Sequence, residues 1–377
     1  MELKNNIELN NWATPSTLST FIAFLFRNGQ IMVSVRNRNI RILMVLCLMF
    51  VSPVRVDACR ACFPLPKKTV ADFLIESEFV VFARESQAQP FTYSTIAILK
   101  GETAPKNIDL FVNSTTRRIL KSNPKHAVVL VRKSNQDSWQ SLGVADGQFQ
   151  EVVKRILAHS GEWTGEKGLN ERYKFFLSLL GHQNRNLHEL AYLEMGRAPY
   201  RTIKKMAKFV SQDDIRSMLL RREYFEWRSL AILMVSQNPN DQDRKLIEES
   251  FQSCHRFSLT TNLTAWATAY IELHGINAID EIDEVYLSNP ERTADEIRTV
   301  LIALSIHGQN DNNKLRDRIV ESYGVALGKH PEMVGLIVND LSVWKTTKYR
   351  DKVMKIARNR NLGFDRQVVT AIQRYVE

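Results

Sequence analysis

The 377-residue chain has little cysteine and no long apolar run. Its four cysteines and eight histidines include neither a second C-x-x-C motif nor an H-E-x-x-H motif, so we predict no zinc site and no cofactor. The longest apolar run, Ile42–Val51, spans ten residues. A run of that length is too short to cross the roughly 30 Å hydrocarbon core of a bilayer. We therefore expect no permanent membrane span.

The apolar run is instead typical of an export signal. Three basic residues precede it, namely Arg36, Arg38 and Arg41, and Val56–Ala58 follows it as a small-residue cleavage site. We predict that residues 1–58 are a signal peptide with an upstream extension, which a start at Met32 would remove. The mature chain would then begin at Cys59 and be periplasmic or extracellular. Lipid anchoring at Cys59 is less favoured, because Asp57 stands where small residues are expected.

Loss of the leader removes Cys47 and leaves Cys59, Cys62 and Cys254 in an oxidising compartment, where a pair is expected to form a disulfide. The short spacing favours Cys59 with Cys62, although a bridge from either residue to Cys254 would close a longer loop with a larger entropic effect. The sequence leaves this choice open. Phe63 follows the second cysteine, where a c-type haem site needs histidine.

The remaining 319 residues exceed one typical domain and suggest two. With 44% hydrophobic and 24% charged residues, the composition is that of a globular protein. The formal net charge is +10 for the whole chain, and residues 1–58 contribute +3 of it, from six Lys/Arg and three Asp/Glu. The other +7 is spread along the chain rather than clustered, so we expect no nucleic-acid partner.

Residues 59–158 have the apolar spacing of strands. Five short segments with turn residues between them are predicted as strands, followed by a helix over Phe149–Leu157: Glu78–Arg84, Phe91–Leu99, Ile108–Val112, Ala127–Val131 and Trp139–Leu142. Five such strands suggest a small barrel or sandwich.

The front of this region resembles the netrin-like (NTR) domain. The resemblance rests on Ala58-Cys59-x-x-Cys62-x-Pro64, on Ser77–Arg84 and on Ile98–Gly101. It implies a five-stranded OB-type β-barrel, as in tissue inhibitors of metalloproteinases. In those inhibitors the N-terminal cysteine chelates the protease zinc, a position that Cys59 would occupy after cleavage. They carry Cys-x-Cys and several disulfides, so the resemblance implies the fold and not the inhibition.

Residues 159–168 hold three glycines and are predicted to be a linker, and from residue 169 to 377 the apolar period is helical. Ile271–Gly275 recurs as Leu304–Gly308, an offset of 33 residues. Such an offset is typical of helical repeats. This half resembles HEAT-type or armadillo-type repeats, which implies an α-helical solenoid, although a non-repeating bundle is the alternative.

Several polar residues of the helical half are candidates for function. Six basic residues form one neighbourhood that could dock an acidic partner, namely Lys204, Lys205, Lys208, Arg216, Arg221 and Arg222. Glu189 and Glu194 on an amphipathic helix are expected to be solvated rather than catalytic. His274 and His307 end their helices, where a cation suits the helix dipole better than metal ligation.

The sequence therefore predicts a mixed α+β protein with two modules and no catalytic residue. We expect an exported, non-enzymatic module that binds or scaffolds a protein or peptide. Its partner would lie on the helices or on the N-terminal edge of the barrel at Cys59 and Cys62. The alternatives are a metalloprotease inhibitor acting through Cys59, or an enzyme whose site lies at the junction of the modules.

Overall fold

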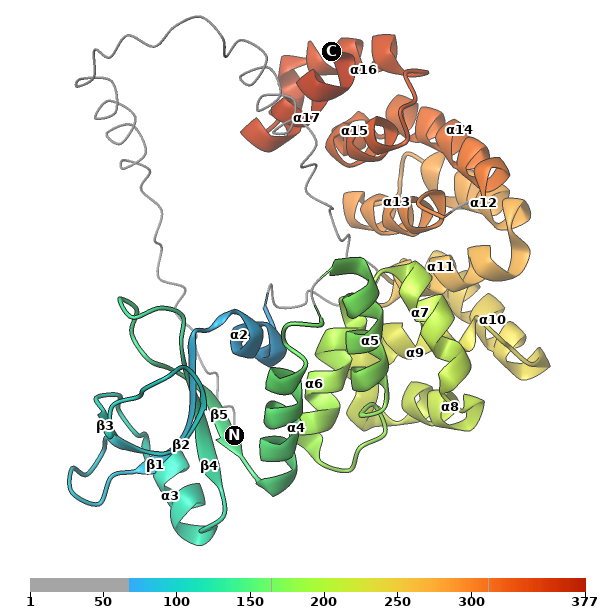
Figure 1. Cartoon of the computed structure of the whole chain (residues 1–377). Coiled ribbons are helices and arrows are strands. Elements are labelled where there is room, and N and C mark those ends of the chain that lie inside the picture. Colours follow the sequence, from blue (N-terminus) through green and yellow to red (C-terminus); the bar gives the residue numbers. More distant parts are fainter. Residues whose placement is uncertain (1–67, 164, 311) are drawn as a thin grey trace, which may run out of the picture. The chain divides into compact units, whose positions relative to one another are not determined.

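The computed structural model describes residues 68–163, 165–310 and 312–377 (Figure 1). A five-stranded antiparallel sheet comes first and helices follow, so the predicted mixed α+β class is confirmed. The strands pair in the order β3-β2-β1-β4-β5, which leaves the sheet open between β3 and β5. They are β1 (Phe79–Glu85), β2 (Tyr93–Lys100), β3 (Asn107–Ile108), β4 (Ala127–Arg132) and β5 (Gln140–Ala145).

The central strand β1 has apolar side chains on both faces, because the sheet is covered on both sides. Val80 and Phe82 belong to the core shared with helices α2 (Val70–Glu76) and α4 (Gly147–Ala158). Val81 and Ala83 belong to a second, smaller core on the opposite face. Double coverage explains why β1 is a continuous apolar run rather than an alternating one.

Two expectations in this region were wrong. The strand predicted at Ile108–Val112 is only two residues long, because the backbone N–H of Val112 donates to the carbonyl of Phe91 instead of continuing the ladder. Helix α3 (Ser114–Ser122) was not predicted. It begins at Asn113, whose side chain accepts from the backbone N–H of Thr116. Its apolar signal is weak, since Leu120 is its only fully buried residue and packs in the second core.

After α4 the chain is helical to its C-terminal end. The helices are α5 (Gly165–Leu177), α6 (Arg185–Gly196), α7 (Tyr200–Met206), α8 (Gln212–Leu220), α9 (Arg228–Val235), α10 (Asp241–Phe257), α11 (Leu263–His274), α12 (Ile276–Ile282), α13 (Ala294–Gly308), α14 (Asn313–Lys329), α15 (Val334–Val343), α16 (Arg350–Ala357) and α17 (Arg366–Val376). Short turns lie between them, 3₁₀ except for the π-turn η3: η1 (Ala207–Phe209), η2 (Arg222–Trp227), η3 (Asp283–Leu287), η4 (Pro331–Met333) and η5 (Arg360–Leu362).

Each helix packs mainly against helices close to it in sequence. The series α9, α11, α13, α15 and α17 makes contacts from one member to the next, and α10 and α14 pack on members of that series. Their buried apolar side chains join those of α2, α4 and one sheet face in one connected core. The segment predicted as a linker takes part in this core: Trp163 is buried against Phe175 and Phe176, and the chain is already helical at Gly165.

Candidate functional site

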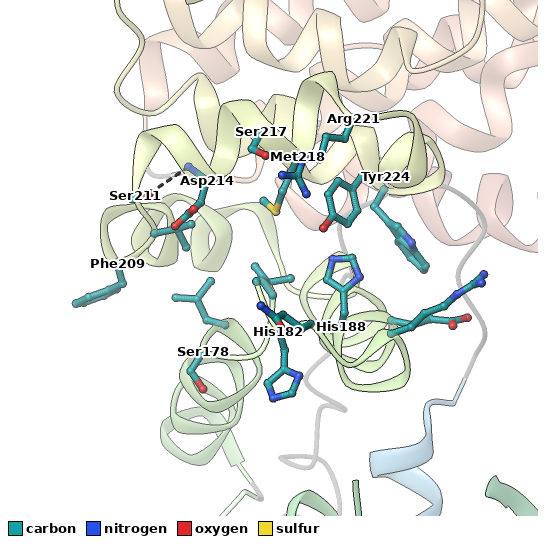
Figure 2. Close-up of a pocket in the computed structure, with 18 of the residues that line it drawn as sticks. Ser178, His182, His188, Phe209, Ser211, Asp214, Ser217, Met218, Arg221 and Tyr224 are labelled. Atoms are coloured by element: carbon teal, nitrogen blue, oxygen red, sulfur yellow. Dashed lines mark hydrogen bonds between the residues drawn. The ribbon is translucent and has the colours of Figure 1, made fainter. Parts of the chain in front are cut away.

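A cavity of about 1190 Å³ opens among the first helices of the helical half (Figure 2). It is lined by the turn after α5, the first part of α6, η1, α8 and η2. Side-chain caps fix where two of these helices begin: Asn184 accepts from the backbone N–H of Asn186, and Ser211 accepts from that of Asp214 at 3.0 Å. Arg185 at the first of these helix starts and Ser211 at the second line the cavity.

Three half-buried aromatic side chains, His188, Tyr224 and Trp227, form one wall. All three pack around Tyr192, which is fully buried, with ring centroids 4.5, 6.1 and 5.3 Å from its own. The Tyr192 hydroxyl donates to the sulfur of Met218, and burial raises its pKa above the usual value, with a further contribution from Tyr224. Tyr192 is thus a neutral support that holds the other rings in place.

The cavity is also rich in charge. Three carboxylates line it, Glu189, Asp214 and Glu226, and none of them forms an ion pair with another described residue. The guanidinium groups of Arg185 and Arg221 line it as well. Aromatic faces combined with ionic groups of both signs suit a segment of polypeptide better than a lipid tail.

A second, basic hollow of about 360 Å³ adjoins this cavity, because Phe209 of η1 lines both. The Phe209 side chain is 69% exposed, and Figure 2 shows it at the end of the cavity away from Tyr224 and His188. The smaller hollow also contains Lys174, Lys205 and Lys208. We call the surface formed by Lys174, Lys205, Lys208 and Phe209 the lysine hollow.

The predicted basic neighbourhood is divided by the structure, since two of its members are neutralised by acidic residues. Lys204 Nζ lies 2.7 Å from the carboxylate of Glu272, and Arg216 lies 2.8 Å from that of Asp243. Burial alone would raise the pKa of Asp243, but the Arg216 guanidinium and the Asn240 backbone N–H outweigh burial and lower it. Lys204 and Arg216 therefore stabilise the fold.

The other four predicted basic residues lie in three places. Lys205 and Lys208 are exposed in the lysine hollow and form no ion pair with another described residue. Arg221 lines the larger cavity, and Arg222 is exposed at the start of η2. Lys205 and Lys208 are the two of the six that lie side by side in one hollow and are exposed to an acidic partner.

Buried ions join the sheet region to the helices. Arg172 of α5 donates to the Asp72 carboxylate of α2 at 2.6 Å and, through Nε, to that of Glu194 of α6 at 2.9 Å. Arg197 also pairs with Asp72, and the Thr69 hydroxyl donates to Glu194. The expectation that Glu194 is solvated was wrong: its side chain is 2% exposed because Arg172 compensates its charge. These polar groups satisfy one another, as a structural network does.

The two helix-ending histidines differ from each other. His274 lies 3.0 Å from the carboxylate of Glu248 on the preceding helix. His307 is buried, and its Nε2 lies 2.9 Å from the carbonyl of Thr268. Burial lowers the His307 pKa, although Glu272 and the Thr268 carbonyl oppose this. The expectation of a cation at the helix end was therefore wrong for His307, which is a neutral core residue.

Cys59 and Cys62 lie outside the described residues. Cys254 is a free thiol buried on α10, and burial raises its pKa to about 11. Within residues 68–163, 165–310 and 312–377, no three His, Cys, Asp or Glu side chains are grouped to hold a metal. None of the helices in these ranges is both long and apolar enough to span a membrane.

No family model, curated protein or solved structure matches the chain. The cavity and the lysine hollow are the features of the described residues that bear on function. Sequence reasoning identified Lys205, Lys208 and Arg221 but missed the aromatic wall and Phe209. The available signal was Phe209 itself, an apolar residue next to two lysines on the polar face of its helix.

Proposed function

We propose that the chain is an exported, non-enzymatic binding protein that holds a segment of a protein partner in the cavity between α5, α6 and α8. The observation that carries the proposal is the cavity itself: about 1190 Å³, open to solvent, and lined by aromatic rings and by three carboxylates that form no ion pair with another described residue. Small-molecule pockets usually measure about 300–1,000 Å³ and are mostly apolar. A larger and more polar cavity suits an extended peptide.

The finer fold proposal is an OB-type, NTR-like barrel followed by HEAT-like repeats. Packing between helices close in sequence supports the repeat interpretation, because each unit of a repeat protein contacts mainly its neighbours in the chain. Such proteins bind segments of other proteins along the helices of successive repeats. Export is proposed from the basic residues before Ile42–Val51 and from the site at Ala58. Edman sequencing of the exported protein tests this, and a mature chain that does not start at Cys59 removes the N-terminal zinc-capture alternative.

Binding is tested by panning a library of random octapeptides against the immobilised full-length chain. Ser178→Trp places an indole at the cavity, where Ser178 is exposed. Ser288→Trp is the matched control, because Ser288 is also exposed directly after a helical segment, here η3, and is not part of the cavity lining. We expect peptides to be enriched on the wild type and on S288W and to be lost on S178W. Enrichment of no peptide, or equal binding by both variants, would refute the proposal.

A further inference from the structure

The lysine hollow gives the occupant of the cavity a charge preference. The lysine hollow contains three ammonium groups and one carboxylate, that of Glu171. The Glu171 carboxylate lies 2.8 Å from Lys174 Nζ. That pair is exposed on both sides, and exposed pairs contribute little. The hollow therefore has an excess of positive charge that no other described residue neutralises.

The exposed ring of Phe209 gives the same surface an apolar anchor point. Phe209 lines both the larger cavity and the lysine hollow. A peptide that leaves the larger cavity across Phe209 therefore reaches Lys205 and Lys208. Met206 and Ala207, three and two residues before Phe209, are buried in the core. Their burial fixes the turn η1, which presents the Phe209 ring to solvent. An aromatic residue within a ring of charges is a frequent arrangement at peptide-binding surfaces.

We infer that the part of the partner segment that leaves the larger cavity is acidic: it places an apolar side chain against Phe209 and Asp or Glu side chains on Lys205 and Lys208. This inference rests on the proposed function. A peptide is favoured over an anionic membrane because the lysines adjoin the larger cavity, which an extended segment of polypeptide can enter and a flat bilayer cannot.

The panned octapeptides are the probe. Peptides enriched on the full-length wild type should carry an excess of Asp and Glu beside an apolar residue. Lys205→Glu with Lys208→Glu should weaken a fluorescent copy of the best peptide about tenfold, since like charges then face its carboxylates. The matched control reverses two exposed lysines elsewhere, Lys245→Glu with Lys355→Glu, and should leave the affinity unchanged. Raising the salt from about 50 to about 500 mM should reduce the difference between the two double variants.

The possible failures are distinguishable. Enriched peptides that are neutral or basic, or that bind K205E/K208E as tightly as the wild type, overturn this inference and leave the proposed function standing. Enrichment of no peptide at all overturns both. Vesicles of phosphatidylglycerol and phosphatidylcholine form the remaining arm. Binding to them that K205E/K208E abolishes, with peptide affinity unchanged, assigns the lysine hollow to lipid and overturns the inference.

Discussion

Replacing Arg172 by methionine should be among the most destabilising single changes at the junction of sheet and helices. Arg172 lies 2.6 Å from Asp72 and 2.9 Å from Glu194, and the three side chains are 10, 11 and 2% exposed. Without the guanidinium, Asp72 keeps Arg197. Glu194 keeps only the Thr69 hydroxyl among these partners. Removing one partner of a buried pair costs about 3–5 kcal/mol, and we expect about 3 kcal/mol because Arg197 remains.

The assay is urea unfolding at pH 7, followed by far-ultraviolet circular dichroism. The two free energies of unfolding can be compared when their slope against urea concentration is the same in the variant and the wild type. Lys174→Met is the matched control. Lys174 lies on the same helix and pairs with Glu171, but both side chains are about half exposed or more, so a change below about 0.5 kcal/mol is expected. Adding Glu194→Gln to the methionine variant removes the uncompensated charge and should restore part of the loss.

The pH dependence gives an independent check. Burial alone would raise the pKa of Asp72, but the Thr69 N–H and the guanidinium groups of Arg172 and Arg197 together lower it below 3.8. The folded pKa therefore lies below the unfolded one. Asp72 contributes stability that is present above about pH 3.8 and lost as the pH falls through its folded pKa. R172M should lose less stability over that acid range than the wild type. A methionine variant as stable as K174M, or one that glutamine at 194 does not improve, would show that the network adds nothing to stability.

Three further predictions concern the helical core. Gly308→Ala would place a Cβ 2.3 Å from the ring of Trp344 and should lower the free energy of unfolding by about 1–3 kcal/mol. Gly147→Ala is the control, because its Cβ would have nothing within 4 Å and should not lower that free energy. Equal urea midpoints for the two variants contradict this prediction. In a Cys47→Ser/Cys59→Ser/Cys62→Ser variant, Cys254 is the one remaining thiol. With its pKa raised to about 11 by burial, it should react with Ellman's reagent only in urea, and rapid native labelling counts against its burial. His307 should make the native state lose stability as the pH falls from 6.5 through its lowered folded pKa, and His307→Gln should flatten that part of a melting-temperature profile; an unchanged slope contradicts it.

Elements with a strong apolar pattern could be predicted from the sequence. Strands β1, β2 and β4 lie within two residues of their expected positions. Strands β1 and β4 each bury a run of apolar side chains, whereas β2 was identified by its aromatic and β-branched residues, although only Tyr93 of this strand is buried. Helix α3 was not predicted because its apolar pattern contains a single fully buried residue, Leu120, and its capping residue Asn113 directly follows the segment predicted as a strand. The end of the predicted linker is helical, because burial of Trp163 against α5 outweighs the glycines that suggested a turn.

Charge was harder to predict than pattern, since whether an ion is buried depends on a partner far away in the sequence. Glu194 and Arg172 are 22 residues apart, and Arg172 and Asp72 are 100 apart. The sequence echo at His274 and His307 does not extend to the surroundings of the two histidines. Gly275 adopts φ +59° as the cap of α11, but Gly308 is still helical and packs under Trp344, so the second histidine is drawn into the core.

Phe209 separates binding from stability more cleanly than the charged residues do. In the stretch from α7 through η1, Met206 and Ala207 face the core, so Lys205, Lys208 and Phe209 must point away from it. A ring that is 69% exposed buries little surface on folding. Phe209→Ser should therefore leave the free energy of unfolding in urea within about 0.5 kcal/mol of the wild-type value. The same change removes the apolar contact at the edge of the larger cavity and should weaken the acidic octapeptide several-fold. If stability falls and peptide affinity does not, the ring supports the fold and the proposed path of the peptide is wrong.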